Sequence, residues 1–130
     1  MSNNKFGSID IPTRTKRRIA IVENSQELIF YSRILNLRGY EIVHVATSMQ
    51  EVINSLEEGK LAYIDYIMID YSKDGLDGLA IAAEVVKREP GIKIIILSRD
   101  ESMRNESLAA GFGFIPKPFT IGELMDGLRR

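Results

Sequence analysis

The sequence contains no cysteine among its 130 residues. A disulfide framework, a thiolate nucleophile and a cysteine-ligated metal site are therefore excluded. No apolar stretch approaches the length of a membrane span, and residues 1–12 are polar, unlike a secretory signal peptide. An excess of one charge is also lacking, because 17 basic residues balance 18 acidic ones, which gives no support for broad electrostatic capture of nucleic acid or membrane. We therefore expect a cytoplasmic protein that recognises its partners through local patches.

The length and a hydrophobic content of 45% suit one domain with a single well-filled core. Residues 1–15 show no hydrophobic period and are expected to form a flexible leader, with the domain spanning residues 16–130. A basic cluster at residues 14–18 is interpreted as a solvated lead-in to the first strand rather than as a phosphate- or lipid-binding patch.

From residue 18 onward, apolar runs of strand length alternate with segments of helical period, which is the pattern of a βαβ series with a parallel sheet. The expected strands are residues 19–22, 41–45, 64–69, 92–97 and 113–115. The expected helices are residues 25–38, a segment from Ser48 to Gly59, a segment with a core-facing stripe of Leu79, Ala82, Ala83 and Val86, residues 101–110, and an amphipathic segment from Thr120.

Several residues mark where these helices should begin and end. Gly39 suits the left-handed position that follows a helix, and the helix that begins at Ser48 should stop at Gly59. Ser48 and Glu51 have the spacing of a capping box, in which each side chain accepts a hydrogen bond from the other residue's backbone. The pair Pro90-Gly91 should stop the helix that carries the Leu79 stripe.

Polar side chains follow the expected strands at the points where the strands end. They are Glu23, Asn24, Asp70, Ser98 and Lys117. Because right-handed crossovers make the strands parallel, their carboxyl ends meet at one edge of the sheet. Such a group of side chains would form a phosphoryl-handling site. The carboxylates would hold Mg²⁺, while the ammonium and the hydroxyl would bind phosphate oxygens. Each residue alone could instead be a helix cap, a turn residue or a solvated side chain.

Four segments together resemble the receiver domain of the two-component response-regulator family, including the chemotaxis regulators. They are IAIVEN at 19–24, YIMID at 66–70 with Asp77-Gly78, ILS at 96–98, and AAGFGFIPKPF at 109–119. The resemblance covers the chain from about residue 16 to its end. It implies a flavodoxin-like, doubly wound α/β fold with a five-stranded parallel sheet in the order 2-1-3-4-5 and five helices.

The resemblance also implies a chemistry. Asp70 would attack a phosphohistidine or a small acyl phosphate and become an aspartyl phosphate, which makes the chain a self-phosphorylating acceptor rather than a turnover enzyme. Lys117 would contact the acyl phosphate, and its peptide bond to Pro118 would be cis. The implied Mg²⁺ ligands are Glu23, Asp70, the backbone carbonyl of Ser72 and, weakly, Asn24.

Phosphorylation would act as a switch in this family. Ser98 would move toward the phosphoryl oxygen and draw Phe114 inward, which alters the surface of the fourth helix, fifth strand and fifth helix. The implied partners are a histidine kinase or phosphotransfer protein upstream and a protein or output domain downstream. Neither direct binding to nucleic acid nor membrane association is expected.

Departures from the family pattern bear on that chemistry. The neutral Asn24 stands where a second acid is usual, so Mg²⁺ should bind less strongly. Arg99 replaces a small residue beside the pocket, where it and Asp100 are expected to modulate the site; its side chain either points into solvent or pairs with Asp70 or Glu23. The short span from Ser98 to Lys117 predicts a shortened or partly unwound fourth helix.

Two classes of function remain open. We favour a phosphorylatable switch in a phosphorelay, and the alternative is a pseudo-receiver that serves as a phosphorylation-independent protein-interaction module. A flavin- or nucleotide-binding domain of the same topology is disfavoured, because the loop ENSQEL after the first strand offers no glycine- or hydroxyl-rich phosphate cradle.

Overall fold

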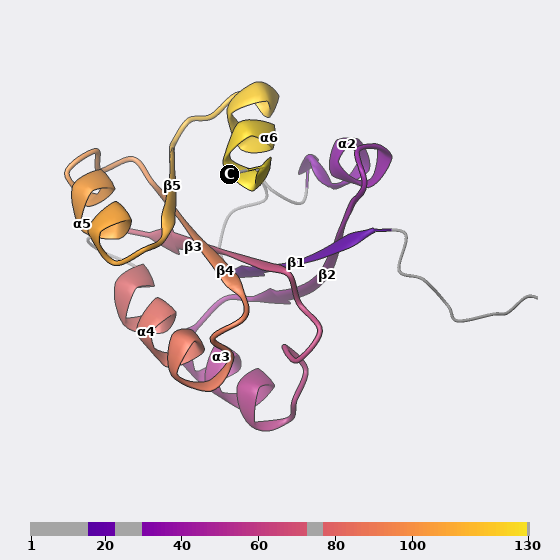
Figure 1. Cartoon of the computed structure of the whole chain (residues 1–130), viewed down its shortest axis with the longest axis vertical. Coiled ribbons are helices and arrows are strands. Elements are labelled where there is room, and N and C mark those ends of the chain that lie inside the picture. The colour runs from indigo at the N-terminus through magenta and orange to yellow at the C-terminus, as the bar shows by residue number, and fades with distance from the viewer. Residues whose placement is uncertain (1–15, 23–29, 73–76, 130) are drawn as a thin grey trace, which may run out of the picture.

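A parallel β-sheet with helices on both faces forms the body of the protein, in a computed structural model that describes residues 16–22, 30–72 and 77–129 (Figure 1). The strands are β1 Arg17–Val22, β2 Tyr40–Ala46, β3 Tyr66–Tyr71, β4 Lys93–Ser98 and β5 Gly113–Pro116. The helices are α2 Ser32–Leu37, α3 Met49–Glu57, α4 Gly78–Arg88, α5 Met103–Ala109 and α6 Ile121–Arg129. All strand pairs are parallel in the order β2-β1-β3-β4-β5, which confirms the predicted flavodoxin-like, doubly wound fold with five helices.

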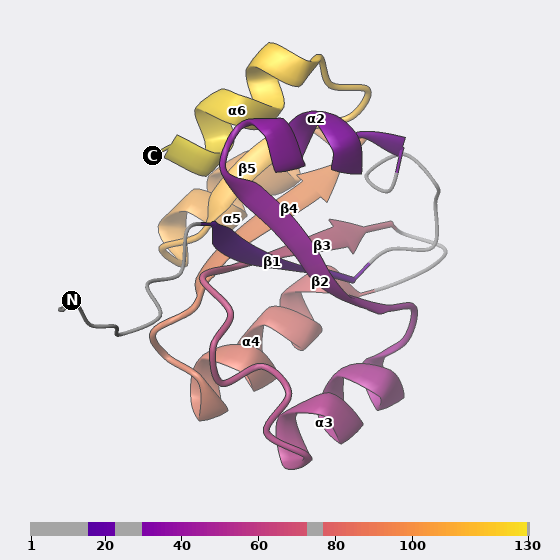
Figure 2. The same ribbon diagram turned by 90° about the vertical axis from the view of Figure 1, so that its right-hand side faces the viewer.

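The sheet separates two hydrophobic cores. Helices α3 and α4 cover one face of it, and α2 and α6 cover the other (Figures 1 and 2). Within β3, Ile67 and Ile69 belong to the core on the α3 and α4 side, whereas Tyr66 and Met68 belong to the core on the α2 and α6 side. Because both faces are covered, the central strands are almost continuous apolar runs, and this made them visible in the sequence.

Most of the predicted helix ends agree with the structure. Gly39 and Gly59 have φ angles of 91° and 73°, in the left-handed region that favours glycine. The hydroxyl of Ser48 accepts a hydrogen bond from the backbone N–H of Glu51 at 3.1 Å, as a capping residue does. The carboxylate of Glu51, however, accepts from the backbone N–H of Thr47 at 2.7 Å, so this half of the predicted capping box forms one residue earlier.

The predicted position of β3 was wrong in detail, and the predicted helix at residues 25–38 is described only in part. The strand β3 begins at Tyr66 rather than residue 64 and continues to Tyr71, because β4 pairs with it over this whole length. Asp70 therefore lies within the strand, paired in register with Leu97, and not after its end. Of the predicted 25–38 helix, α2 forms the last part, and residues 25–29 lie outside the described residues, as does the predicted leader at 1–15.

The buried stripe of α4 is rotated from the predicted one. Gly78, Ile81, Ala82 and Val85 are buried, whereas Ala83 and Val86 of the predicted stripe are exposed. The first residue of α4, Gly78, packs closely against Ile69 and Asp70 of β3. Because Gly78 faces the sheet, the residues three and four positions after it face the sheet as well. The final amphipathic helix agrees with prediction, since Leu124, Met125 and Leu128 of α6 are buried.

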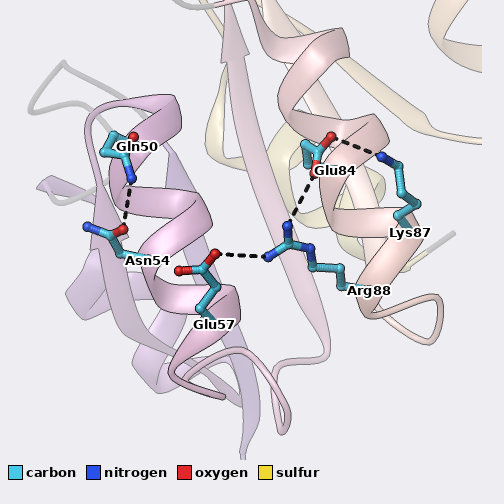
Figure 3. A network of polar contacts seen from close by, with 6 residues as sticks. All are labelled: Gln50, Asn54, Glu57, Glu84, Lys87 and Arg88. Carbon is cyan, nitrogen blue, oxygen red and sulfur yellow. Dashed lines mark hydrogen bonds and ion pairs between the residues drawn. The ribbon is translucent and has the colours of Figure 1, made fainter.

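Polar side chains connect the outer surfaces of α3 and α4 (Figure 3). Arg88 of α4 lies between two carboxylates, with Nη1 3.9 Å from Oε2 of Glu57 in α3 and Nη2 3.8 Å from Oε1 of Glu84 in its own helix. Exposed ion pairs of this kind stabilise a fold by about 0–1 kcal/mol each. The α3–α4 pair is therefore held chiefly by the core beneath it.

Among the helices that the structure describes, none has both the length and the apolar character that a membrane span requires.

Candidate functional site

An ion pair between Asp70 and Lys117 lies at the carboxyl edge of the sheet. Lys117 Nζ donates a hydrogen bond to Asp70 Oδ1 at 2.8 Å, and the two side chains are only 8% and 15% exposed, respectively. Asp70 comes from β3, while Lys117 directly follows β5, on the far side of β4. The Lys117–Pro118 peptide bond is cis, as expected. Lys117 thus binds one of the two carboxylate oxygens of Asp70, Oδ1.

A cavity of about 460 Å³ opens beside this ion pair. Its lining residues are Asp70, Tyr71, Ser72, Ser98, Arg99, Asp100 and Lys117. Six of the residues that the sequence singled out thus surround one cavity, although they lie on three separate strand ends. Glu23 and Asn24 lie outside the described residues, and Phe114 does not line the cavity. The cavity falls within the size range of small-molecule sites, so a phosphoryl group fits inside it.

The hydroxyl of Ser98 makes two hydrogen bonds to the backbone. It donates to the carbonyl oxygen of Tyr71 at 3.0 Å and accepts from the backbone N–H of Asp100 at 3.0 Å. Ser98 is 2% exposed, so water offers little alternative. A hydroxyl has one proton to donate, and a bond from Ser98 to a phosphoryl oxygen would have to replace the bond to Tyr71.

The two residues after Ser98 differ in their surroundings. Asp100 Oδ1 accepts hydrogen bonds from the backbone N–H of Ser102 at 3.0 Å and from its hydroxyl at 2.6 Å, which shapes the turn that leads into α5. Arg99 is exposed at the cavity. Helix α5 has only seven residues, which agrees with the predicted shortening.

Sequence reasoning missed the part that Gly78 plays at the site. A Cβ atom at Gly78 would lie 2.8 Å from the carbonyl oxygen of Asp70 and 3.2 Å from Cγ2 of Ile69. The preceding Asp77 caps α4, because its Oδ1 accepts a hydrogen bond from the backbone N–H of Ala80 at 3.1 Å. The first turn of α4 therefore lies directly against the backbone of Asp70. The Asp77-Gly78 pair is part of the resemblance to receiver domains, but its spacing alone does not predict this contact.

Phe114 is buried at 8% exposure, in the core that also contains Met103 of α5. The guanidinium of Arg104 lies over its ring, with Cζ 4.9 Å from the centroid, which is a cation–π arrangement. Glu101 accepts a hydrogen bond from Arg104, and this bond lowers the pKa of the Glu101 carboxyl. Phe114 thus occupies an inward position while Ser98 is bonded to Tyr71.

The described residues supply part of a magnesium site. Hard cations such as Mg²⁺ take oxygen ligands, and the Asp70 carboxylate and Ser72 both line the cavity. Within residues 16–22, 30–72 and 77–129 there is no group of three or more His, Cys, Asp or Glu residues that could hold a metal ion. One carboxylate with Ser72 fits Mg²⁺ as a partial ligand set.

Comparison with known proteins agrees with the fold. The family model for the response regulator receiver domain matches residues 19–129. The sensor kinase CckA of Brucella abortus (strain 2308) is 37% identical over 97 residues, which cover 71% of this chain and 10% of the kinase. The chemotaxis protein CheY of Thermotoga maritima is 27% identical over 118 residues, 88% of this chain and 96% of CheY.

A solved structure supports the same fold. The response regulator protein TrrA from Thermotoga maritima, crystallised in complex with Mg²⁺-BeF, has a TM-score of 0.70 at 24% identity, covering 87% of this chain and 96% of TrrA. Length differs widely among the relatives, since this chain spans 10% of CckA and 20% of a matching two-component response regulator from Arabidopsis thaliana. Because the family model covers nearly the whole described chain, this protein belongs to the response regulator receiver domain family.

Proposed function

We propose that Asp70 accepts a phosphoryl group from a phosphohistidine, carried by a histidine kinase or phosphotransfer protein, or from a small acyl phosphate. The observation that carries this proposal is the 2.8 Å bond between Lys117 Nζ and Asp70 Oδ1 beside a cavity large enough to admit a phosphoryl group. Oδ2 attacks phosphorus, the bond from phosphorus to the donor nitrogen or oxygen breaks, and its electron pair leaves with the histidine or the acid. Lys117 offsets the repulsion between the carboxylate and the incoming dianion.

Four groups are proposed to hold Mg²⁺: the side chains of Glu23 and Asp70, the backbone carbonyl of Ser72 and, weakly, Asn24. The structure of TrrA in complex with Mg²⁺-BeF supports the choice of this metal. When bound, the ion supplies positive charge near the reacting oxygens. The proposed receiver domain spans residues 16–130, after a leader at 1–15. Receiver domains are generally signalling domains rather than turnover enzymes.

The proposed output is the surface formed by α5, β5 and α6. Ser98 connects the site to this surface. Its hydroxyl donates to the carbonyl of Tyr71 in β3 and accepts from the N–H of Asp100, which lies in the turn before α5. Release of the Tyr71 bond frees the Ser98–Asp100 segment to move with α5 and with Phe114 packed behind it. A downstream protein or output domain would bind this surface, and no contact with nucleic acid or membrane is proposed.

A pseudo-receiver is the second candidate, and the position of Phe114 favours it. Phe114 is already buried under Arg104, so its inward state does not require a phosphoryl group. In that case the α5–β5–α6 surface is permanently in one form and binds its partner without phosphorylation.

Intact mass spectrometry after incubation with acetyl phosphate and Mg²⁺ tests the choice. The parent chain should gain one phosphoryl group, and Asp70→Asn should gain none. Asp126→Asn is a matched control, because it removes an exposed carboxylate of α6 and should label like the parent. A folded parent that gains no mass would refute the phosphoryl-acceptor proposal and favour the pseudo-receiver.

A further inference from the structure

Arg99 brings a second cation to the cavity beside Asp70. Its backbone is held on both sides, because the carbonyl of Ser98 accepts a hydrogen bond from the N–H of Lys117 at 2.8 Å and the N–H of Asp100 donates to Ser98 Oγ at 3.0 Å. The Arg99 side chain itself is exposed and contributes to the cavity wall. With its backbone held in this way, the exposed Arg99 adds a positive charge to the lining of the cavity.

The other charged groups of the wall already have partners. Lys117 is paired with Asp70, and Asp100 accepts two hydrogen bonds from Ser102. Arg99 makes no hydrogen bond or ion pair with any residue in the described part of the chain. Its charge is therefore available to an anion that enters the cavity.

A phosphoryl dianion is the anion that suits these groups. The guanidinium presents several N–H donors in a planar fork that matches two phosphate oxygens at once, and such charge-assisted pairs are stronger than neutral hydrogen bonds. A cavity of about 460 Å³ accommodates a small donor such as an acyl phosphate.

We propose that Arg99 binds the phosphoryl group of a small phosphodonor, or inorganic phosphate, at the mouth of the cavity. The binding of a phosphodonor by Arg99 rests on the proposed function, whereas the binding of inorganic phosphate does not. Arg99 is then a donor-binding residue, and its interaction forms before transfer and persists through it. Loss of such uniform binding raises the donor concentration needed for half-maximal rate and leaves the maximal rate nearly unchanged.

The first test is a titration with inorganic phosphate, without divalent metal, followed by ¹H–¹⁵N NMR. In the parent, the amide signals of residues 98–100 should shift and saturate. Arg99→Gln should weaken phosphate binding about tenfold or more, because a hydrogen bond to a charged group is lost. Arg33→Gln is the control: it removes an exposed arginine of α2 that does not line the cavity, and this variant should bind phosphate like the parent. Equal affinities for the two variants, or no shift at residues 98–100, would overturn the inference.

The second test measures the initial rate of labelling against acetyl phosphate concentration. Arg99→Gln should raise the half-saturating concentration about tenfold with a maximal rate within about twofold of the parent. Arg99→Lys should fall between them, because it keeps the charge and loses the fork. An unchanged half-saturating concentration in Arg99→Gln would refute donor binding by Arg99. If the parent binds phosphate through Arg99 but is never labelled, the proposed function fails and the phosphate site stands.

Discussion

Replacing Gly78 with alanine should disturb both the stability of the fold and the reactivity of Asp70. The added Cβ would lie 2.8 Å from the carbonyl oxygen of Asp70 and 3.3 Å from its carbonyl carbon. These are backbone atoms of a central strand, so relief requires that the first turn of α4 moves away from β3. Overpacking of this kind costs about 1–3 kcal/mol. Alanine recovers about 1 kcal/mol through its helix propensity, which leaves a net loss of up to about 2 kcal/mol.

The assay is urea unfolding of the parent and of two variants, with labelling by acetyl phosphate measured alongside. Gly122→Ala is the matched control, because Gly122 also lies in the first turn of a helix, α6, and the nearest atom to its new Cβ would be Thr120 Oγ1 at 3.7 Å. That variant should be as stable as the parent or up to about 1 kcal/mol more stable, and it should label at the parental rate. Gly78→Ala should unfold at lower urea and label more slowly. Equal unfolding midpoints and labelling rates for the two variants would refute the close-contact argument.

Two further predictions concern buried polar atoms. The hydroxyl of Ser107 in α5 is fully buried and has no hydrogen-bond partner in the described part of the chain, so Ser107→Ala should raise the free energy of unfolding by about 1 kcal/mol in the same urea assay; a loss of stability would show that the hydroxyl is satisfied in solution. Lys93 Nζ is likewise buried without a hydrogen-bond partner there, 5.9 Å from the centroid of the Tyr66 ring. Lys93→Met keeps the aliphatic packing and should be neutral or stabilising by about 1 kcal/mol in thermal unfolding, whereas a clearly lower melting temperature would show that the contact with Tyr66 outweighs desolvation.

The sequence pattern was sufficient to predict a parallel sheet and the gathering of Asp70, Ser98 and Lys117, and the resemblance to receiver domains supplied the strand order. Strands buried on both faces are continuous apolar runs, and a parallel sheet brings their polar ends together whatever their separation along the chain. Features that depend on the approach of two elements were not predictable in this way. The phase of α4 and the contact of Gly78 with Asp70 follow from how helix and strand pack, which no single segment encodes.

The hydrogen bonds of Ser98 could not be predicted from the sequence either, because they too depend on how two elements approach each other. A serine at a strand end has several possible acceptors, and the choice of the Tyr71 carbonyl depends on β3 extending one residue beyond Asp70. Likewise, the exposed position of Arg99 reflects the anchoring of its neighbours, and sequence reasoning left both orientations open. Local patterns thus identified the residues of the site, while their partners required the assembled sheet.

The alternation of β5 between the two cores has a consequence for signalling. Phe114 packs with Met103 on the α5 side of the sheet, and the next residue, Ile115, packs with Leu124 on the α6 side. Lys117 continues this strand, so a shift of its backbone displaces Phe114 and Ile115 together, in opposite layers of the molecule. Under the proposed function, phosphorylation of Asp70 would therefore reach both faces of the sheet through β5, one through Phe114 and the other through Ile115.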